Sequence, residues 1–317
     1  MSNRLMLVIE DPQVLGRVCG PNDANLKEVG GLLNSRVFSR GNEIFLESQD
    51  KENFPLFKNL IEQMTDRSRT NDLEKGYIQS LFKSINPRES LDQEDFSQCR
   101  IRIPGSDSEL YPYNEKQASL IRMMDEQDMV FAVGPAGTGK TYLAIAQALK
   151  EVLQKKKRKI ILTRPVVEAG ENLGFLPGDL EQKLNPYLRP LYDAMEDLLP
   201  NDLLMRMSDN NLFEVSPLAY MRGRSLKNCF IVLDEAQNTT QSQMKMFLTR
   251  LGEGSKAIVT GDITQIDLPS RKRSGLVHAC EILKDIDDIG FCHFDKSHVI
   301  RSQLVKQIIM AYESEEK

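Results

Sequence analysis

The sequence predicts an α/β fold in which a mostly parallel sheet is flanked by helices, preceded by a small α+β domain. From residue 111 onward, short apolar segments alternate with longer amphipathic ones, which is the pattern of a mostly parallel sheet. The chain has 317 residues, and at roughly 150 residues per domain this length corresponds to about two domains. Residues 86–110 show no sustained helical or strand period and are expected to link the two.

The first domain, residues 1–85, is expected to have the element order β-α-β-β-α. Its strands are predicted over residues 4–9, 36–39 and 43–47, and its helices over residues 24–33 and from residue 53 onward. The last two strands should form a hairpin, because Gly41 and Asn42 between them accept the positive φ of a tight turn. Asn22 and Asp23 supply N-cap chemistry before the first helix, and the second helix is opened by Asn53.

The second domain is expected over residues 111–317, with residues 86–110 as the linker. Its strands are predicted over residues 129–133, 159–162, 229–233, 257–260 and 290–294. Each is a short apolar run bounded by polar or turn residues, which is typical of a strand buried in a parallel sheet.

Composition excludes several classes of protein. The net charge of −5 rules out a diffuse basic coat, so that any nucleic-acid site must be local. No run approaches the roughly 18 apolar residues of a membrane span. The N-terminal apolar run of five residues is too short for a signal peptide, so we expect a cytoplasmic protein without membrane contact. The five cysteines contain no C-x-x-C pair, which argues against a disulfide framework or a thiolate zinc site.

The most informative stretch follows the strand predicted over residues 129–133. It matches the pattern G-x-x-x-x-G-K-[ST] between a strand and a helix. The residues expected to bind a nucleotide here are Gly134, Pro135, Ala136, Gly137, Thr138, Gly139, Lys140 and Thr141. Lys140 should hold the β- and γ-phosphates and Thr141 a Mg²⁺ ion, while the helix N-terminus adds its partial positive charge.

Two carboxylates follow the strand predicted over residues 229–233. Asp234 at the strand end is placed to hold the Mg²⁺ shell, and Glu235 can orient and deprotonate water for attack on a γ-phosphate. Adjacent acids after a buried strand favour hydrolysis over transfer to a small hydroxyl. The alternative is that the two acids simply form a solvated strand end, which is common for an isolated Asp-Glu pair.

A Gly-Asp turn follows the strand predicted over residues 257–260. Gln265 lies three residues after Asp262 and can place an amide near the γ-phosphate, so that it senses the nucleotide state. Simple turn chemistry is the alternative explanation of this stretch.

Together, residues 134–141, 234–237 and 261–265 resemble motifs I, II and III of superfamily 1 helicase-type ATPases, which are RecA-like P-loop NTPases. The strings RPVVEAGE at 164–171, LGFLPG at 173–178 and PYLRPLY at 186–192 are similar to the PhoH family of bacterial P-loop ATPases. The first 85 residues resemble, more weakly, the KH-like N-terminal domain of PhoH-like proteins.

This resemblance implies ATP and Mg²⁺ as ligands and a local RNA site. It also implies a partner, an endoribonuclease of the YbeY type. Gln117 matches the adenine-reading glutamine upstream of the phosphate loop, and a solvated helix residue is its alternative. Arg164 can face a phosphate or a nucleic-acid strand. The first domain contains no Gly-x-x-Gly, the loop that clamps a nucleic-acid backbone in KH domains.

Superfamily 1 helicases carry two ATPase-type lobes, whereas about 200 residues follow residue 111 here, enough for one. A neighbouring subunit would then donate the arginine that completes the site. Arg301 is the first candidate, followed by Arg271 and Arg273. Head-to-tail donation generates a homo-oligomeric ring when the rotation closes.

The sequence leaves two functions open: an ATPase that remodels or helps process RNA, and a nucleotide-gated scaffold that recruits a nuclease without unwinding RNA. A small-molecule kinase is disfavoured by Glu235, since a kinase needs an acceptor-binding base instead. The basic runs at 155–159 and 271–273 can contact RNA, although a solvated helix end also explains the first.

Overall fold

The computed structural model describes residues 3–70, 72–73, 76–86, 99–106, 109–165, 180–268 and 274–300. The chain divides into two compact units. The first consists of Met1–Arg100 and Glu109–Ala118, and the second of Ile101–Ser108 and Ser119–Lys317.

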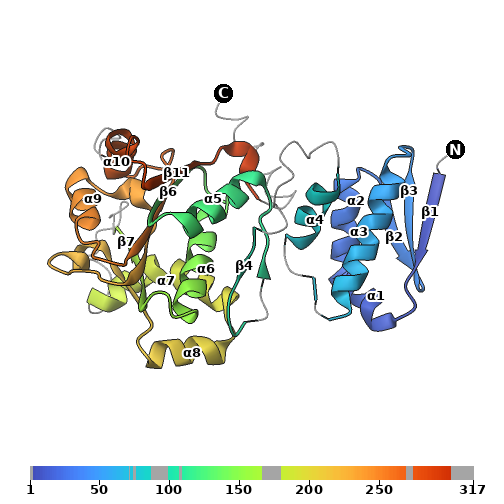
Figure 1. Ribbon diagram of the computed structural model, residues 1–317, viewed down its shortest axis with the longest axis horizontal. Coiled ribbons are helices and arrows are strands. Elements are labelled where there is room, and N and C mark those ends of the chain that lie inside the picture. Colours follow the sequence, from blue (N-terminus) through green and yellow to red (C-terminus); the bar gives the residue numbers. More distant parts are fainter. Residues whose placement is uncertain are drawn as a thin grey trace. The chain divides into compact units, whose positions relative to one another are not determined.

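The first unit is built on a three-stranded antiparallel sheet with helices on one of its faces (Figure 1). Its strands are β1 Asn3–Val8, β2 Arg36–Arg40 and β3 Glu43–Ser48, in the spatial order β1-β3-β2. Its helices are α1 Pro12–Cys19, α2 Ala24–Leu32, α3 Asn53–Ser68 and α4 Tyr77–Ile85, with a 3₁₀ turn at Pro21–Asp23. Strand β5, Glu109–Leu110, also belongs to this unit. Ile44 and Leu46 of β3 are fully buried in the core between sheet and helices.

The structure contains the three strands and two helices expected in the first unit and adds two helices, α1 and α4. Helix α1 is only eight residues long, and it is held by Asp11, whose side chain accepts from the backbone N–H groups of Gln13 and Val14. Asp23 takes the N-cap position of α2, as predicted, but its backbone is left-handed with φ 57° and its side chain makes no capping hydrogen bond. Helix α3 begins at Asn53, as predicted, and the Asn53 amide donates to Leu33 O at 2.8 Å. The likeness to a KH domain stays a prediction.

The second unit contains a six-stranded parallel sheet. Its strands are β6 Met129–Val133, β7 Lys159–Arg164, β8 Phe213–Pro217, β9 Cys229–Leu233, β10 Lys256–Gly261 and β11 Ile289–His293. The helices are α5 Glu115–Glu126, which begins in the first unit, α6 Lys140–Leu153, α7 Leu180–Leu198, α8 Asn201–Asp209, α9 Gln241–Leu248 and α10 Gly275–Leu283. Strand β4, Ile101–Arg102, and 3₁₀ turns at Leu218–Met221, Ala236–Asn238 and Lys296–His298 complete the unit.

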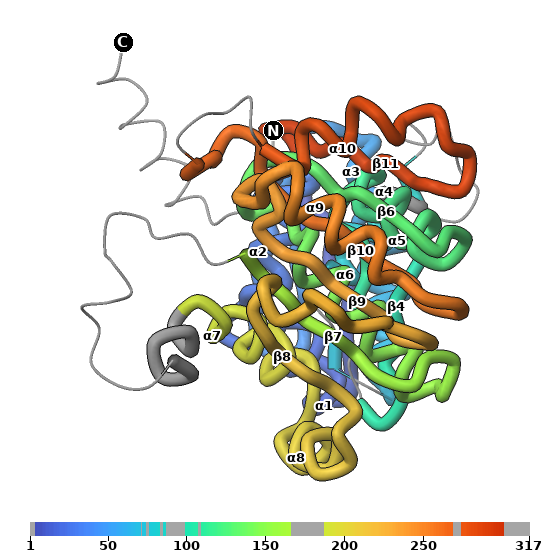
Figure 2. The backbone as a smooth tube through the Cα atoms, turned by 90° about the vertical axis from the view of Figure 1, so that its left-hand side faces the viewer, coloured from blue at the N-terminus to red at the C-terminus, as the bar shows by residue number. Residues whose placement is uncertain are grey.

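The strands of this sheet follow one another in the order β11-β6-β10-β9-β7-β8, as Figure 2 shows. All five neighbouring pairs are parallel. Val133 at the end of β6 lies opposite Gly261 of β10, and Leu233 at the end of β9 lies opposite Thr163 of β7. The residues that follow these four strands therefore meet at one edge of the sheet, where α/β proteins bind ligands.

Helices cover both faces of the sheet. In Figure 1, α9 and α10 lie on one side of the strands and α5 and α6 on the other. Phe131, Leu233 and Val259 belong to the core that faces α9 and α10, together with Phe247 and Leu276 of those helices. The predicted α/β class with a mostly parallel, helix-flanked sheet is confirmed. Strand β8 was missed, because its partly buried sequence FEVSP includes a charge and ends in proline.

No helix among the described residues is long and apolar enough to cross a membrane.

Candidate functional site: a phosphate-loop cleft

A cleft of about 350 Å³ opens at the carboxyl edge of the parallel sheet. Its walls come from the segments that follow β6, β7, β9 and β10, together with helices α6 and α7. The lining residues are Ala136, Gly137, Gly139, Lys140, Thr141, Tyr142, Arg164, Pro190, Ala194, Asp234, Glu235, Gly261, Asp262 and Gln265. The structure therefore brings together side chains that are up to 129 positions apart in the chain, from Ala136 to Gln265.

The loop between β6 and α6 lines the cleft and contains glycines with positive φ. Gly137 and Gly139 have φ values of 79° and 81°, which side-chain-bearing residues rarely adopt. Gly139 is the N-cap of α6 and no side chain caps this helix end. Its first N–H groups are therefore available to an anion, and the helix dipole favours negative charge there.

Gly134 is required for a different reason, the close approach of another chain segment. A Cβ atom at this position would lie 2.5 Å from the carbonyl oxygen of Phe294, just after β11. The Gly134 N–H donates to Gly261 O at 3.0 Å, which ties the start of the loop to the end of β10.

Lys140 folds back over the loop. Its Nζ donates to Pro135 O at 2.7 Å and to Thr138 Oγ1 at 3.1 Å. Burial lowers the pKa of Lys140, and the carboxylates of Asp262 and Asp234 oppose that shift. A buried ammonium beside an anion-binding loop is suited to contact a phosphate group, whose negative charge would favour the protonated amine.

Asp234, which is buried at the end of β9, joins the loop to the sheet. Its Oδ1 accepts from Thr141 Oγ1 at 2.6 Å and from Thr260 Oγ1 at 2.7 Å. A hydroxyl and a carboxylate within hydrogen-bond distance match the hard oxygen donors that Mg²⁺ takes from P-loop proteins, with water and phosphate oxygens filling the other positions. Thr141 and Asp234 are thus the residues that could hold this ion.

Glu235 stands beside Asp234 in a left-handed conformation, with φ 52° and ψ 37°. This backbone turns its half-exposed carboxylate toward Arg164, at the end of β7. The guanidinium of Arg164 lies 3.0 Å from Asp234 Oδ2 and 3.0 Å from Glu235 Oε1. A hydrogen bond from Arg164 Nη1 to Tyr187 O, at 2.9 Å, anchors the arginine to α7. Arg164 thus contacts the two acidic groups in this structure, and whether it faces a phosphate or a nucleic-acid strand stays a prediction.

Two buried polar residues, which lie in the predicted motifs but were given no role from the sequence, connect these groups. Asp262 Oδ2 accepts from the Ala136 N–H in the phosphate loop at 3.0 Å. Gln237 accepts from the Asp262 N–H at 3.0 Å and donates to the Glu235 carboxylate. The sequence could have indicated a role for Asp262 in the site, since this residue directly follows a buried strand. Nothing in the sequence indicates that the Gln237 side chain contacts the segment after β10.

Gln265 lines the cleft with an exposed side chain, and its backbone N–H donates to Asp262 O at 3.1 Å. The turn chemistry weighed for this stretch is therefore present, while the role of the Gln265 amide as a nucleotide sensor stays a prediction.

The remaining candidate residues lie elsewhere. Gln117 is buried in α5, in the first unit, where its Oε1 accepts from the Tyr113 N–H at 2.8 Å. It is not a solvated helix residue, and its contact with adenine stays a prediction. Arg301, Arg271 and Arg273 lie outside the described residues.

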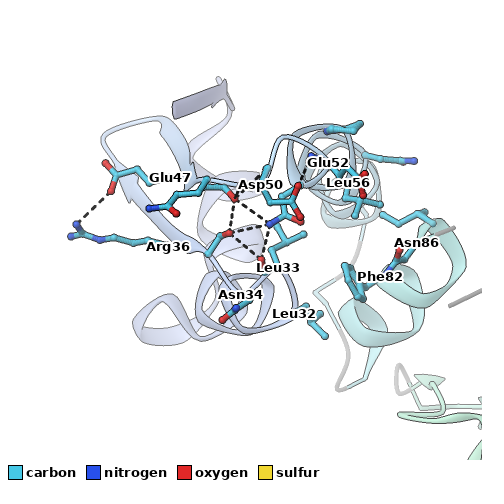
Figure 3. A pocket seen from close by; sticks show the side chains of 17 residues that line it. Leu32, Leu33, Asn34, Arg36, Glu47, Asp50, Glu52, Leu56, Phe82 and Asn86 are labelled. Atoms are coloured by element: carbon cyan, nitrogen blue, oxygen red, sulfur yellow. Dashed lines mark hydrogen bonds and ion pairs between the residues drawn. The ribbon is translucent and has the colours of Figure 1, made fainter. Parts of the chain in front are cut away.

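A larger cavity, of about 940 Å³, lies within the first unit (Figure 3). Its floor is a network of neutral groups, in which the Asn53 amide donates to Leu33 O, Ser35 Oγ and Ser48 Oγ at 2.8 to 3.2 Å. These groups satisfy one another. Within the described ranges, no group of three or more His, Cys, Asp or Glu side chains could hold a metal ion. The phosphate-loop cleft is therefore the candidate site.

A parallel sheet whose first central strand runs into a glycine-rich loop and helix, with a threonine and an aspartate joined behind the loop, defines a P-loop NTPase. A family model described as PhoH-like protein matches residues 109–313. The chain belongs to the PhoH family.

Relatives agree with this assignment. The chain is 42% identical over 319 residues to a PhoH-like protein of Bacillus subtilis, covering 97% of this chain and 96% of the relative. It is 44% identical over 308 residues to a PhoH-like protein of Mycobacterium bovis, covering 95% and 85%. Protein PhoH of Escherichia coli is 43% identical over 201 residues, covering 63% and 57%. A solved structure of Pif1 helicase from Candida albicans matches 57% of this chain and 40% of its own at 15% identity, with a TM-score of 0.30, which is too low to carry an argument.

Proposed function

We propose that the protein binds ATP with Mg²⁺ in the phosphate-loop cleft, hydrolyses it, and couples hydrolysis to the remodelling or processing of RNA. The observation that carries the hydrolytic part is the pairing of Asp234 with Thr141, at 2.6 Å, with Glu235 directly beside them in the same cleft. One carboxylate is then available for the metal and the next for water, which is the division of labour of P-loop ATPases.

The residues of the cleft have separate roles in this proposal. The loop N–H groups and Lys140 bind the β- and γ-phosphates. Glu235 accepts a proton from a water molecule whose oxygen attacks the γ-phosphorus, and the bond to the bridging oxygen of ADP breaks. Mg²⁺, held through Thr141 and Asp234, supplies positive charge that stabilises the phosphate oxygens. Gln237 orients Glu235 and transmits the state of the site to the segment after β10.

A second candidate function is a nucleotide-gated scaffold that binds ATP, hydrolyses it slowly and recruits a nuclease. The contacts of Arg164 with both carboxylates favour it, because a guanidinium 3.0 Å from Glu235 occupies the carboxylate oxygen that would otherwise contact water. Both functions share the binding residues and differ in whether RNA changes the rate of hydrolysis.

The proposed partners follow from the family rather than from the cleft. We propose an RNA substrate, an endoribonuclease of the YbeY type and a homo-oligomeric ring in which one subunit donates an arginine, first Arg301, to its neighbour. Such donation typically increases turnover about 10³- to 10⁵-fold in related NTPases, so that an isolated subunit should be a slow enzyme.

Steady-state ATP hydrolysis, measured with and without single-stranded RNA, tests the main proposal. Stimulation by RNA supports a remodelling ATPase. A rate that RNA does not change would instead support the nucleotide-gated scaffold. Glu235→Gln is the control for contaminating phosphatase activity. It should lower the rate of hydrolysis about 10²- to 10⁴-fold while nucleotide binding persists. Lys140→Ala should lose nucleotide binding under both functions.

Arginine donation has a separate test, in which Arg301→Ala subunits are mixed with Lys140→Ala subunits. A mixed interface can combine an intact phosphate loop with an intact arginine, so activity above that of either parent is expected. Mixtures that never exceed their parents would show that Arg301 is not donated between subunits.

A further inference from the structure

The sheet of the first unit has a second face, opposite the helices. Ile44 and Leu46 of β3 point into the core, so the alternate residues of the same strand point away from it. The register places three rows on this outer face: Arg4, Glu47 and Arg36; Met6, Phe45 and Phe38; Val8, Glu43 and Arg40. We call this set the outer sheet face.

The centre of the outer sheet face is aromatic. The rings of Phe38 and Phe45 are stacked, with centroids 5.3 Å apart and planes 25° from parallel. Phe45 is buried although it lies on the face opposite the core that holds Ile44 and Leu46, while Phe38 is half-buried. The stacked pair is therefore a flat apolar surface with Phe38 as its accessible ring.

Arginines surround the two rings. The Arg4 guanidinium lies 3.9 Å from the Phe45 centroid, and the Arg36 guanidinium lies 5.0 Å from the Phe38 centroid. Glu47 lies within ion-pair distance of both arginines, 3.9 Å from Arg4 and 3.6 Å from Arg36 (Figure 3 labels Arg36 and Glu47).

The third row adds the exposed Arg40 and also Glu43. With three arginines and two glutamates, the outer sheet face has a positive net charge, whereas the net charge of the whole chain is −5. Met6 and Val8 on β1 are 47% and 51% exposed, which is unusual for apolar residues in a sheet. An exposed apolar patch with charged residues at its rim marks an interaction surface.

We infer that the outer sheet face binds single-stranded RNA. Bases stack on aromatic rings and on guanidinium planes, and arginine side chains contact the phosphates between them. Phe38 and the guanidinium groups over the rings offer such planes, and Arg40 is placed for a phosphate. Met6 and Val8 extend the apolar surface to β1. The choice of RNA as the polymer rests on the proposed function; the placement on this face rests on the side chains.

The full-length protein and a fluorescently labelled oligouridylate of roughly 12 nucleotides, a length within the range one such surface covers, test this inference by fluorescence anisotropy. Phe38→Leu removes the π face and keeps the apolar contact with the sheet. It should weaken RNA binding about 5- to 150-fold, the range for the loss of one stacked base. Tyr220→Leu, which alters a half-exposed aromatic residue of the second unit, is the matched control and should bind RNA as the unaltered protein does.

Arg40→Gln is a second variant that keeps the protein folded, because the side chain is exposed. It should reduce the slope of log affinity against log salt by about 0.7, the value for one phosphate contact to a single strand. Arg206→Gln on α8 is its control. Hydrolysis of ATP without RNA should be unchanged in both outer-face variants.

The outcomes separate this inference from the proposed function. If the unaltered protein binds RNA and both outer-face variants bind it equally well, the inference is wrong and the proposed function stands. If the unaltered protein does not bind RNA, the RNA part of the proposed function fails as well. Tighter binding of the matching single-stranded DNA would overturn the assignment to RNA. Self-association that Phe38→Leu abolishes without changing RNA affinity would assign the face to a second copy of the chain instead.

Discussion

The guanidinium of Arg164 lies 3.0 Å from the carboxylate of Glu235, the residue proposed to accept a proton from water. The same guanidinium contacts Asp234 at 3.0 Å. Under the proposed function, Arg164 therefore competes with Mg²⁺ for Asp234 and with the attacking water for Glu235. The arginine stabilises the acids while the site holds no metal, and its displacement would couple nucleotide binding to α7 through Tyr187.

Arg164→Gln should make the ligand-free protein less stable and increase its response to ligand. Asp234 would be left buried without its cation, at a cost of about 1 to 3 kcal/mol, moderated by the hydroxyls of Thr141 and Thr260 that still donate to it. Mg²⁺ with ADP restores the missing charge. Thermal unfolding with and without this ligand checks the prediction.

The control for Arg164→Gln is Arg206→Gln, which breaks an exposed pair with Asp202 on α8. Exposed pairs contribute little, about 0 to 1 kcal/mol, so this variant should show the ligand response of the unaltered protein. Equal ligand-induced shifts in the Arg164 and Arg206 variants would argue against competition between Arg164 and the metal.

Gln237→Leu should reduce ATP hydrolysis more than nucleotide binding. The amide links the Glu235 carboxylate to the Asp262 N–H without lining the cleft itself. Without this amide, Glu235 can adopt other rotamers. We therefore expect kcat to fall about tenfold to hundredfold, the size of effect that misplacement of a catalytic group by about 1 Å can produce. Gln237→Glu, which keeps one oxygen for the Asp262 N–H but repels Glu235, should be no better. A fall in binding equal to the fall in kcat would point to a general loss of structure instead.

Gly134→Ala should destabilise the protein and abolish nucleotide binding. The added Cβ would lie 2.5 Å from Phe294 O and 2.6 Å from Phe294 Cβ, and the backbone at φ 152° disfavours any side chain. Either the loop or the segment after β11 must move, at a cost of about 1 to 3 kcal/mol. Gly223→Ala is the matched control, because φ is also positive there, at 79°, while no atom lies within 4 Å. Nucleotide titrations and urea unfolding of both variants separate crowding from backbone strain.

Glu214→Gln should reveal a pH-dependent contribution to stability. Hydrogen bonds from Arg224 and Lys159, each 3.0 Å from Oε2, lower the pKa of Glu214 to about 2. A carboxylate with a lowered pKa stabilises the folded state above its unfolded pKa of about 4.3 and loses that contribution as the pH falls toward 2. We expect the variant to be about 1 to 3 kcal/mol less stable at pH 7, a difference that shrinks at pH 3. Urea unfolding at the two pH values checks this, and a difference independent of pH would contradict it.

Local patterns predicted most of the fold. The strand that ends at Val133 follows from its apolar run, the loop after it from the spacing of its glycines, and the next helix from its helical period. All three signals lie within about 25 residues of the chain. Short elements were harder. Helix α1 and strand β8 have eight and five residues, lengths at which periodicity is weak and packing decides the structure.

The sequence by itself determined the chemistry of the site, because the residue types and their spacing decide which groups can hold phosphate, metal and water. Lys140, Thr141, Asp234 and Glu235 could be named without coordinates. Only the tertiary structure decided which of these groups touch one another. The register of four parallel strands brings Arg164 onto Glu235 and Asp262 onto the phosphate loop. Such contacts depend on which strands are neighbours, and that order is set by burial of the whole sheet between its two layers of helices rather than by any local pattern.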